Sequence, residues 1–162
     1  MMMRYGSLVI FLLAVVAVSV AASGFEAGYW YFEKATRPAW SPPPWLFGPA
    51  WALAYLALAL AAWQGWLGGR DGRVGALLAW LVLLLSSGVW SWLVFGLHRI
   101  GWAWLEMGLV LVLAVWCLVR FRRLAAQAAW LMLPFVAWIA FLWVWNLALW
   151  TLNGGPLARF LS

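Results

Sequence analysis

The sequence has very few charged or chemically reactive side chains. Of its 162 residues, 9% are charged and 4 are acidic, and it contains 1 cysteine (Cys117) and 1 histidine (His98). A single cysteine excludes an internal disulfide, and so few scattered ligands do not build a tetrahedral metal site. No acid/base pair is evident either, so we expect no metal and no catalytic residues of the conventional acid–base kind.

Apolar residues make up 69% of the chain, and 17 residues are tryptophan. A soluble domain of this length could not bury so much apolar surface. Runs of about 20 apolar residues are typical of transmembrane helices. We therefore predict an all-α integral membrane protein, with a single domain over residues 1–162 that forms a five-transmembrane-helix bundle. The expected helices are residues 5–23, 44–67, 74–97, 101–120 and 128–152.

The first apolar run has two interpretations. Arg4, the apolar stretch and the small residues Ala21, Ala22 and Ser23 also fit a cleaved signal peptide. The run is nevertheless long enough to cross a bilayer, so we expect residues 5–23 to remain as the first helix.

The net charge is +6 and comes almost entirely from arginine, since Lys34 is the only lysine. These cations lie at the ends of the apolar runs, which is typical of topology signals and lipid headgroup contacts in a bilayer. No basic stripe with exposed aromatic residues is present, so we expect no nucleic acid partner. The bias toward arginine and alanine indicates a bacterial source, and hence the bacterial cell membrane.

Residues 24–43 form the longest polar connection and end in a dense proline run. Proline fixes φ and removes a backbone donor, so this run cannot lie inside a helix. One interpretation is a rigid interhelical loop at the membrane surface, with Trp40 and Trp45 as interfacial anchors. The other is a lid that closes over a ligand.

Few polar residues fall inside the apolar runs. Asn146 must face protein, water or ligand, because lipid offers no hydrogen-bond partner. Glu106 either belongs to a functional site or, as we expect, reaches the interface or pairs with Arg99. Serines such as Ser87 most often bond back to their own helix.

Three blocks of the sequence resemble the translocator protein (TspO/MBR) family, the tryptophan-rich sensory proteins. The first block consists of Trp30-Tyr31, the run Arg37-Pro38-Ala39-Trp40-Ser41-Pro42-Pro43-Pro44-Trp45-Leu46-Phe47, and then Trp51 and Tyr55. The second block consists of Trp90, Phe95-Gly96 and Arg99. The third block consists of Leu133-Pro134-Phe135, Trp138, Asn146 and Asn153. The chain departs from the family pattern at Ser87, where an amide is replaced, and at Phe135, where a hydroxyl is lost.

The resemblance implies five transmembrane helices, a homodimer, and one pocket in each bundle beneath the lid. It implies porphyrins such as protoporphyrin IX, or another apolar planar compound, as ligands; no cofactor is required. By motif match, the candidate ligand-binding residues are Trp30, Trp40, Trp51, Tyr55, Ser87, Trp90, Trp138 and Asn146.

The aromatic residues among these candidates are suited to bind a planar macrocycle, because their side chains offer flat faces for stacking. Arg37 or Lys34 would pair with porphyrin propionates at the wet mouth. His98 falls in a turn, so metal-free porphyrin is a better candidate than iron-ligated heme. On pattern alone, each tryptophan could instead pack inside the bundle or anchor it at the membrane interface.

Three functions remain open: a receptor or sensor that regulates tetrapyrrole or stress responses, which we favour; a transporter of porphyrins or lipids; and a light-dependent porphyrin-degrading enzyme.

Overall fold

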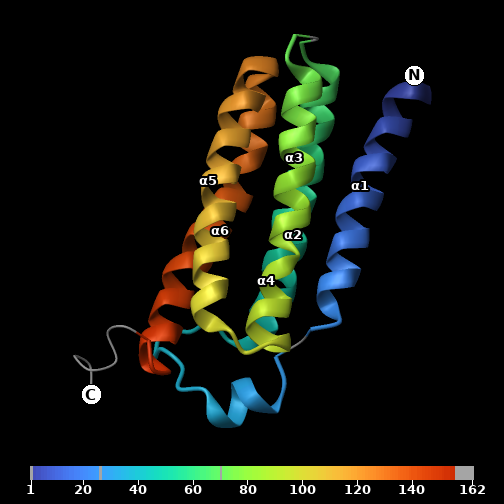
Figure 1. Cartoon of the computed structure of the whole chain (residues 1–162). Helices are drawn as coiled ribbons and strands as arrows, with labels where there is room; N and C mark the ends of the chain where they lie inside the picture. The colour runs from blue at the N-terminus through green and yellow to red at the C-terminus, as the bar shows by residue number, and fades with distance from the viewer. Residues whose placement is uncertain (1, 26, 70, 156–162) are drawn as a thin grey trace.

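The computed structural model describes residues 2–25, 27–69 and 71–155, and all of its regular elements within those ranges are helical. The α-helices are α1 (Met2–Ser23), α2 (Pro44–Leu67), α3 (Arg73–Ser87), α4 (Val89–Ser91), α5 (Ile100–Leu124) and α6 (Ala126–Leu152). Two π-helical turns, η1 (Trp30–Lys34) and η2 (Trp92–Gly96), complete the set. Five helical segments are long and apolar enough to cross a membrane, with α3, α4 and η2 counted as one (Figure 1). The protein is a multi-pass integral membrane protein.

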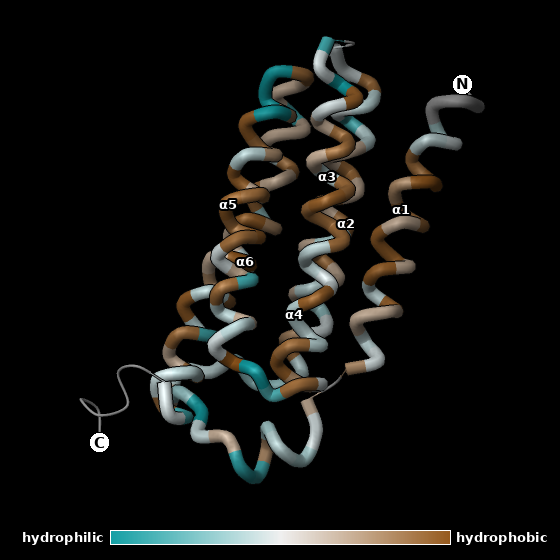
Figure 2. Tube along the Cα trace, in the orientation of Figure 1, coloured by the Kyte–Doolittle hydropathy of each residue, from teal (hydrophilic) through white to brown (hydrophobic). Residues whose placement is uncertain are grey.

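The predicted helix bounds hold for α2, and the structure corrects those of α5. We expected this helix to end at residue 120, but it continues to Leu124 and includes Arg122 and Arg123 in its last turn. Cations are favourable at a helix C-terminus because they offset the partial negative charge of the free carbonyls. The arginines therefore cap the helix rather than interrupt it, and the hydrophilic end of α5 is visible in Figure 2.

The third span is not the continuous helix over residues 74–97 that the sequence predicted. It begins at Arg73, is interrupted at Gly88, and ends in η2 at Gly96. A Cβ atom at Gly88 would lie 2.9 Å from a methyl carbon of Val18, so glycine lets α1 approach the third span here. His98 follows η2 with a φ of 54°, which places it in the left-handed region within a tight turn.

Helices α5 and α6 pack closely because tryptophan rings of α6 lie directly against glycines of α5. A Cβ atom at Gly101 would lie 2.9 Å from the Trp150 ring, and one at Gly108 would lie 3.0 Å from Nε1 of Trp143. Small residues at helix contacts allow this close approach in membranes. Helix α1 lies at the outside of the bundle and diverges from α3 toward its N-terminus (Figure 1).

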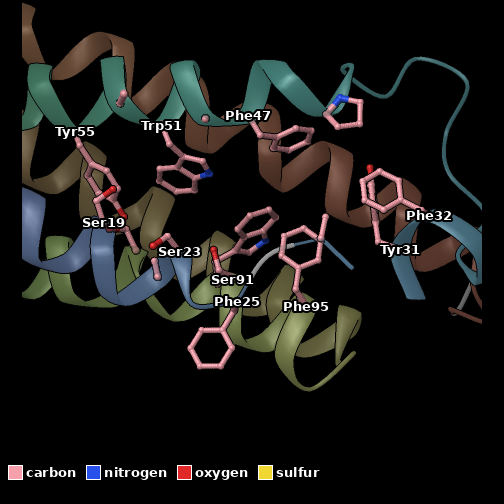
Figure 3. A pocket seen from close by; sticks show the side chains of 17 residues that line it. Ser19, Ser23, Phe25, Tyr31, Phe32, Phe47, Trp51, Tyr55, Ser91 and Phe95 are labelled. Atoms are coloured by element: carbon pink, nitrogen blue, oxygen red, sulfur yellow. Dashed lines mark hydrogen bonds between the residues drawn. The ribbon is translucent and has the colours of Figure 1, made fainter. Parts of the chain in front are cut away.

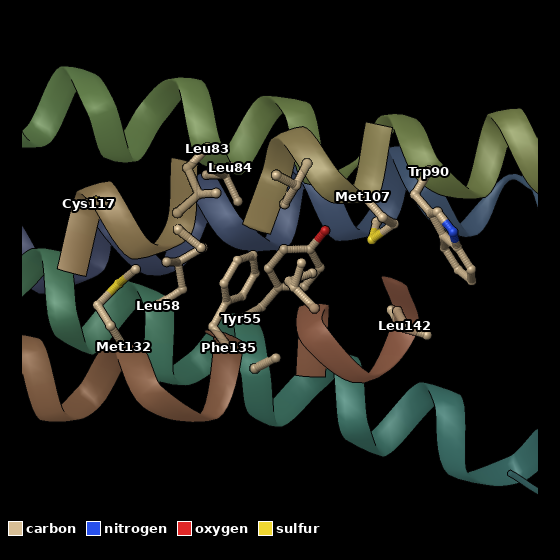
Figure 4. Packing of buried hydrophobic residues seen from close by; sticks show 14 of the residues in the cluster. Tyr55, Leu58, Leu83, Leu84, Trp90, Met107, Cys117, Met132, Phe135 and Leu142 are labelled. Atoms are coloured by element: carbon tan, nitrogen blue, oxygen red, sulfur yellow. The ribbon is translucent and has the colours of Figure 1, made fainter. Parts of the chain in front are cut away.

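Fully buried side chains run along the whole bundle, from Phe121 near the α2–α3 turn to Trp145 and Leu149 near the lid end. Leu58, Leu83, Phe135 and Met132 have no exposed surface, and Figure 4 shows them packed from α2, α3 and α6 to one side of Tyr55. These four side chains fill the bundle between Tyr55 and the α2–α3 turn. Open space remains at the opposite end, beneath the segment that links α1 to α2.

Candidate functional site

A cavity of about 410 Å³ lies at the end of the bundle where residues 24–43, hereafter the lid, cross between α1 and α2. Helices α1 and α2, the third span and the lid all contribute to its wall (Figure 3). Its volume falls within the range of small-molecule sites.

One wall of the cavity is aromatic. Trp51 stacks on Tyr55 with ring centroids 5.2 Å apart and planes inclined by 27°. Trp90 lies 6.0 Å from Trp51 and contacts Phe95 edge to face at 5.5 Å. Phe47 from α2 extends this wall toward the lid (Figure 3). Such rings present flat apolar faces, which suit a planar ligand.

Hydroxyl groups from two spans also line the cavity. Ser19 and Ser23 are four residues apart on α1, and Ser87 and Ser91 are four apart on the third span, so each pair shares a helical face. Ser87 donates to the Leu84 carbonyl at 2.8 Å and lies 3.3 Å from the Tyr55 hydroxyl.

The Ser23 hydroxyl donates to the Val20 carbonyl at 2.8 Å. Among the described residues, the hydroxyls of Ser19 and Ser91 have no hydrogen-bond partner and remain available to a ligand.

The structure brings four of the eight sequence-predicted residues together around the cavity: Trp51, Tyr55, Ser87 and Trp90. Trp138 lies behind this wall, edge to face with Trp51 at 6.3 Å and with Phe47 at 5.9 Å. It therefore supports the cavity wall rather than lining it.

The other three predicted residues lie elsewhere. Asn146 is fully buried on α6, and neither atom of its amide has a partner among the described residues. Trp30 stacks on His98 with a centroid distance of 4.6 Å, in a separate surface hollow. Trp40 is half exposed and contacts Phe141 edge to face at 6.0 Å.

Glu106 differs from its expected arrangement. Both carboxylate oxygens are buried, and neither has a hydrogen-bond partner among the described residues. The carboxylate thus neither reaches the interface nor pairs with Arg99, because it lies on the side of α5 that faces into the bundle.

The lid closes the cavity with Tyr31, whose side chain is only 3% exposed. Its ring packs against Phe95 at 5.6 Å and Trp145 at 6.1 Å. Burial raises the pKa of the Tyr31 phenol above its usual value of 10.0, and the positive charge of Arg37 partly opposes this shift. The phenol therefore stays neutral over the physiological range.

Sequence reasoning missed the α1 serines and the phenylalanines Phe25, Phe47 and Phe95 of the cavity wall. A signal for the serines was present, because each of two separate spans carries a pair of serines spaced by four residues. Phe47 and Phe95 fall within the motif blocks quoted above, which was a signal for both, whereas no comparable signal marked Phe25, whose position depends on how the chain folds after α1. Within the described residues, no cluster of three metal-ligating side chains is found.

A membrane-spanning helical bundle with an aromatic cavity beneath a proline-rich lid defines a class of membrane proteins built to hold a small apolar molecule. The chain belongs to the TspO/MBR family, whose sequence model matches residues 8–151.

Relatives from distant organisms support this assignment. The chain is 35% identical over 151 residues to the "Tryptophan-rich protein TspO" of Archaeoglobus fulgidus, covering 90% of this chain and 96% of the relative. It is 29% identical over 143 residues to the protein of the same name from Chlorobaculum tepidum, covering 85% and 89%. It is 30% identical over 131 residues to the human "Translocator protein", covering 79% and 78%.

Proposed function

We propose that the protein is a membrane receptor or sensor that binds porphyrin-type tetrapyrroles in the cavity and regulates tetrapyrrole or stress responses. The observation that carries this proposal is the Trp51–Tyr55 stack, which lines a cavity of about 410 Å³ together with four serines. Family membership supports it, because the first and specific motif block contributes Trp51 and Tyr55 to the wall.

The lining favours a planar ligand with few polar groups. A macrocycle would stack on Trp51, and its polar edge would meet the free hydroxyls of Ser19 and Ser91. No charged side chain belongs to the described lining of the cavity. Ionised groups of a ligand would therefore remain at the mouth, where water and the lid are accessible.

The packed core favours binding over conduction. Leu58, Leu83 and Phe135 have no exposed surface and fill the bundle between Tyr55 and the α2–α3 turn (Figure 4). A transporter of porphyrins or lipids would need a path through this region, and opening one would require several buried side chains to move. This supports the receptor over the transporter.

A protoporphyrin IX titration of detergent-purified protein, followed by quenching of tryptophan fluorescence, tests the proposal. Trp51→Phe should weaken binding about two- to tenfold, because it reduces the stacking surface. Trp138→Phe should weaken it less, since Trp138 lies behind the wall. Trp130→Phe is the matched control, because Trp130 is 72% exposed on α6.

Saturable binding with this order of effects would support the cavity. Non-saturable quenching that is equal in all variants would show partitioning into the micelle and would contradict the proposal. Flux into vesicles would instead reveal a transporter, and oxidation products after illumination would reveal a porphyrin-degrading enzyme.

We also propose that the protein is a homodimer in a bacterial cell membrane, as the resemblance and the composition suggest. Gly75 and Ala79 have the GxxxA spacing that can mark a contact between membrane helices, but both already pack against other residues of this chain. Ala79 is buried within the bundle, and a Cβ atom at Gly75 would lie 2.5 Å from the Arg120 guanidinium. A second copy would thus bind another face, which cysteine cross-linking in membranes can locate.

A further inference from the structure

Two cations of the lid occupy different positions relative to the cavity. The Arg37 guanidinium carbon lies 5.5 Å from the ring centroid of Tyr31 and 5.9 Å from that of Phe32, and both rings line the cavity. The Lys34 ammonium instead lies 5.7 Å from the Tyr29 ring, in the separate hollow where Trp30 stacks on His98. Of these two lid cations, Arg37 therefore lies against rings that line the cavity, and Lys34 does not.

The Arg37 guanidinium has unused hydrogen-bonding capacity. It is exposed, and no carboxylate among the described residues pairs with it. The two aromatic rings restrict where the guanidinium can lie, and hydrogen bonding to the Tyr31 phenol uses only part of its N–H donors. A guanidinium presents five such donors in a planar fork that matches a carboxylate.

The backbone on both sides of Arg37 is fixed. The Thr36 amide donates to Oδ1 of Asn153 at 2.9 Å, and Nδ2 of Asn153 donates to the Thr36 carbonyl at 2.8 Å. Nδ2 also donates to the Leu149 carbonyl at 2.6 Å, which anchors the amide to the end of α6. On the other side, the buried Pro38 restricts Arg37 to extended geometry.

One side-chain amide thus holds both polar groups of the Thr36 backbone, across 117 positions of sequence. Because Arg37 directly follows Thr36, loss of this pair would free the guanidinium to leave the two rings. The hydrogen bonds of Asn153, which lies outside the cavity, thus help to position the Arg37 guanidinium.

We infer that Arg37 is a specificity-determining residue that selects ligands with a carboxylate at the cavity mouth, and that Asn153 is a positioning residue acting through the lid. This inference rests on the proposed function, because it requires the ligand to occupy the cavity. It assigns the recognition of the acidic groups to one of the two lid cations.

The test compares protoporphyrin IX with its dimethyl ester, which has the same ring and no free carboxylates, on the full chain in detergent. The wild type should bind the acid about fivefold more tightly than the ester, as expected for a partly exposed charge pair. Arg37→Gln should remove this preference and leave the ester affinity unchanged. Lys34→Gln should keep the preference.

Asn153→Ala should reduce the acid preference, leave ester affinity unchanged, and speed hydrogen exchange at the Thr36 amide. A purely structural loss would instead weaken acid and ester equally. Arg37→Lys should restore only part of the preference, because an ammonium lacks the planar fork.

Equal binding of acid and ester by the wild type would overturn the inference while leaving the cavity intact. An equal loss of preference in Arg37→Gln and Lys34→Gln would also overturn it, since only the general positive field of the lid would then matter. Failure of both compounds to bind saturably would overturn the proposed function, and this inference with it.

Discussion

The indole N–H of Trp145 donates a hydrogen bond to the Ser41 hydroxyl oxygen at 3.0 Å. Trp145 is fully buried on α6, and Ser41 lies in the proline run of the lid, 104 positions away in the sequence. The bond fixes the second half of the lid to the bundle, just as Asn153 fixes Thr36. Among the described residues, the lid therefore has two polar attachments to α6 and its C-terminal cap.

We expect Ser41→Ala to loosen the lid by about 1–3 kcal/mol, because it leaves the buried indole N–H of Trp145 without a partner. The amides of residues 35–41 should then exchange hydrogen faster, while those of the helix cores stay unchanged. Ser86→Ala is the matched control, since the Ser86 hydroxyl has no hydrogen bond to any described residue. Unchanged exchange in the lid would show that this bond does not hold it.

The two glycines after α2 should respond differently to alanine. A Cβ atom at Gly68 would lie 2.5 Å from the backbone oxygen of Leu124, whereas one at Gly69 would have 3.9 Å to the nearest side-chain atom. We expect Gly68→Ala to cost about 1–3 kcal/mol, because the end of α5 must move. Thermal unfolding in detergent would measure this loss, and Gly69→Ala should melt close to the wild type. Equal melting temperatures would contradict the tight contact.

Alkaline pH should weaken the lid through Tyr31. Its folded-state pKa is raised above 10.0, mainly by burial, so folding favours the neutral phenol. The resulting stability is fully present below pH 10, and it is lost as the pH rises through the folded-state pKa. Tyr31→Phe should remove one of the late-titrating groups from a titration of tyrosinate absorbance. Identical curves for the two proteins would refute this assignment.

The sequence predicted the spans well because long apolar runs leave few alternatives in a membrane. It did not predict the break at Gly88 or the π-helical turn after it, since both arise where α1 packs against the third span. It also predicts the end of α5 four residues too early, because charged residues such as Arg122 end the apolar run although they are favourable in the last turn of a helix.

The site was predictable where it depends on one helix. Trp51 and Tyr55 are four residues apart, so one helical face carries both to the cavity. Trp138 and Asn146 depend on how α6 rotates against its neighbours, and the structure places neither on the cavity wall. The pairing of Asn153 with Thr36 joins residues 117 positions apart, and no local pattern encodes such a contact.

The packing of Leu58, Leu83 and Phe135 has a kinetic consequence. None of these three side chains lines the cavity, so under the proposed function a bound molecule would not cross the bilayer through this layer. Occupancy would then report the ligand that reaches the cavity without passing this layer, whatever the gradient across the bilayer. The protein would then sense the ligand on one side of the bilayer, with a response time set by dissociation of the ligand from the cavity.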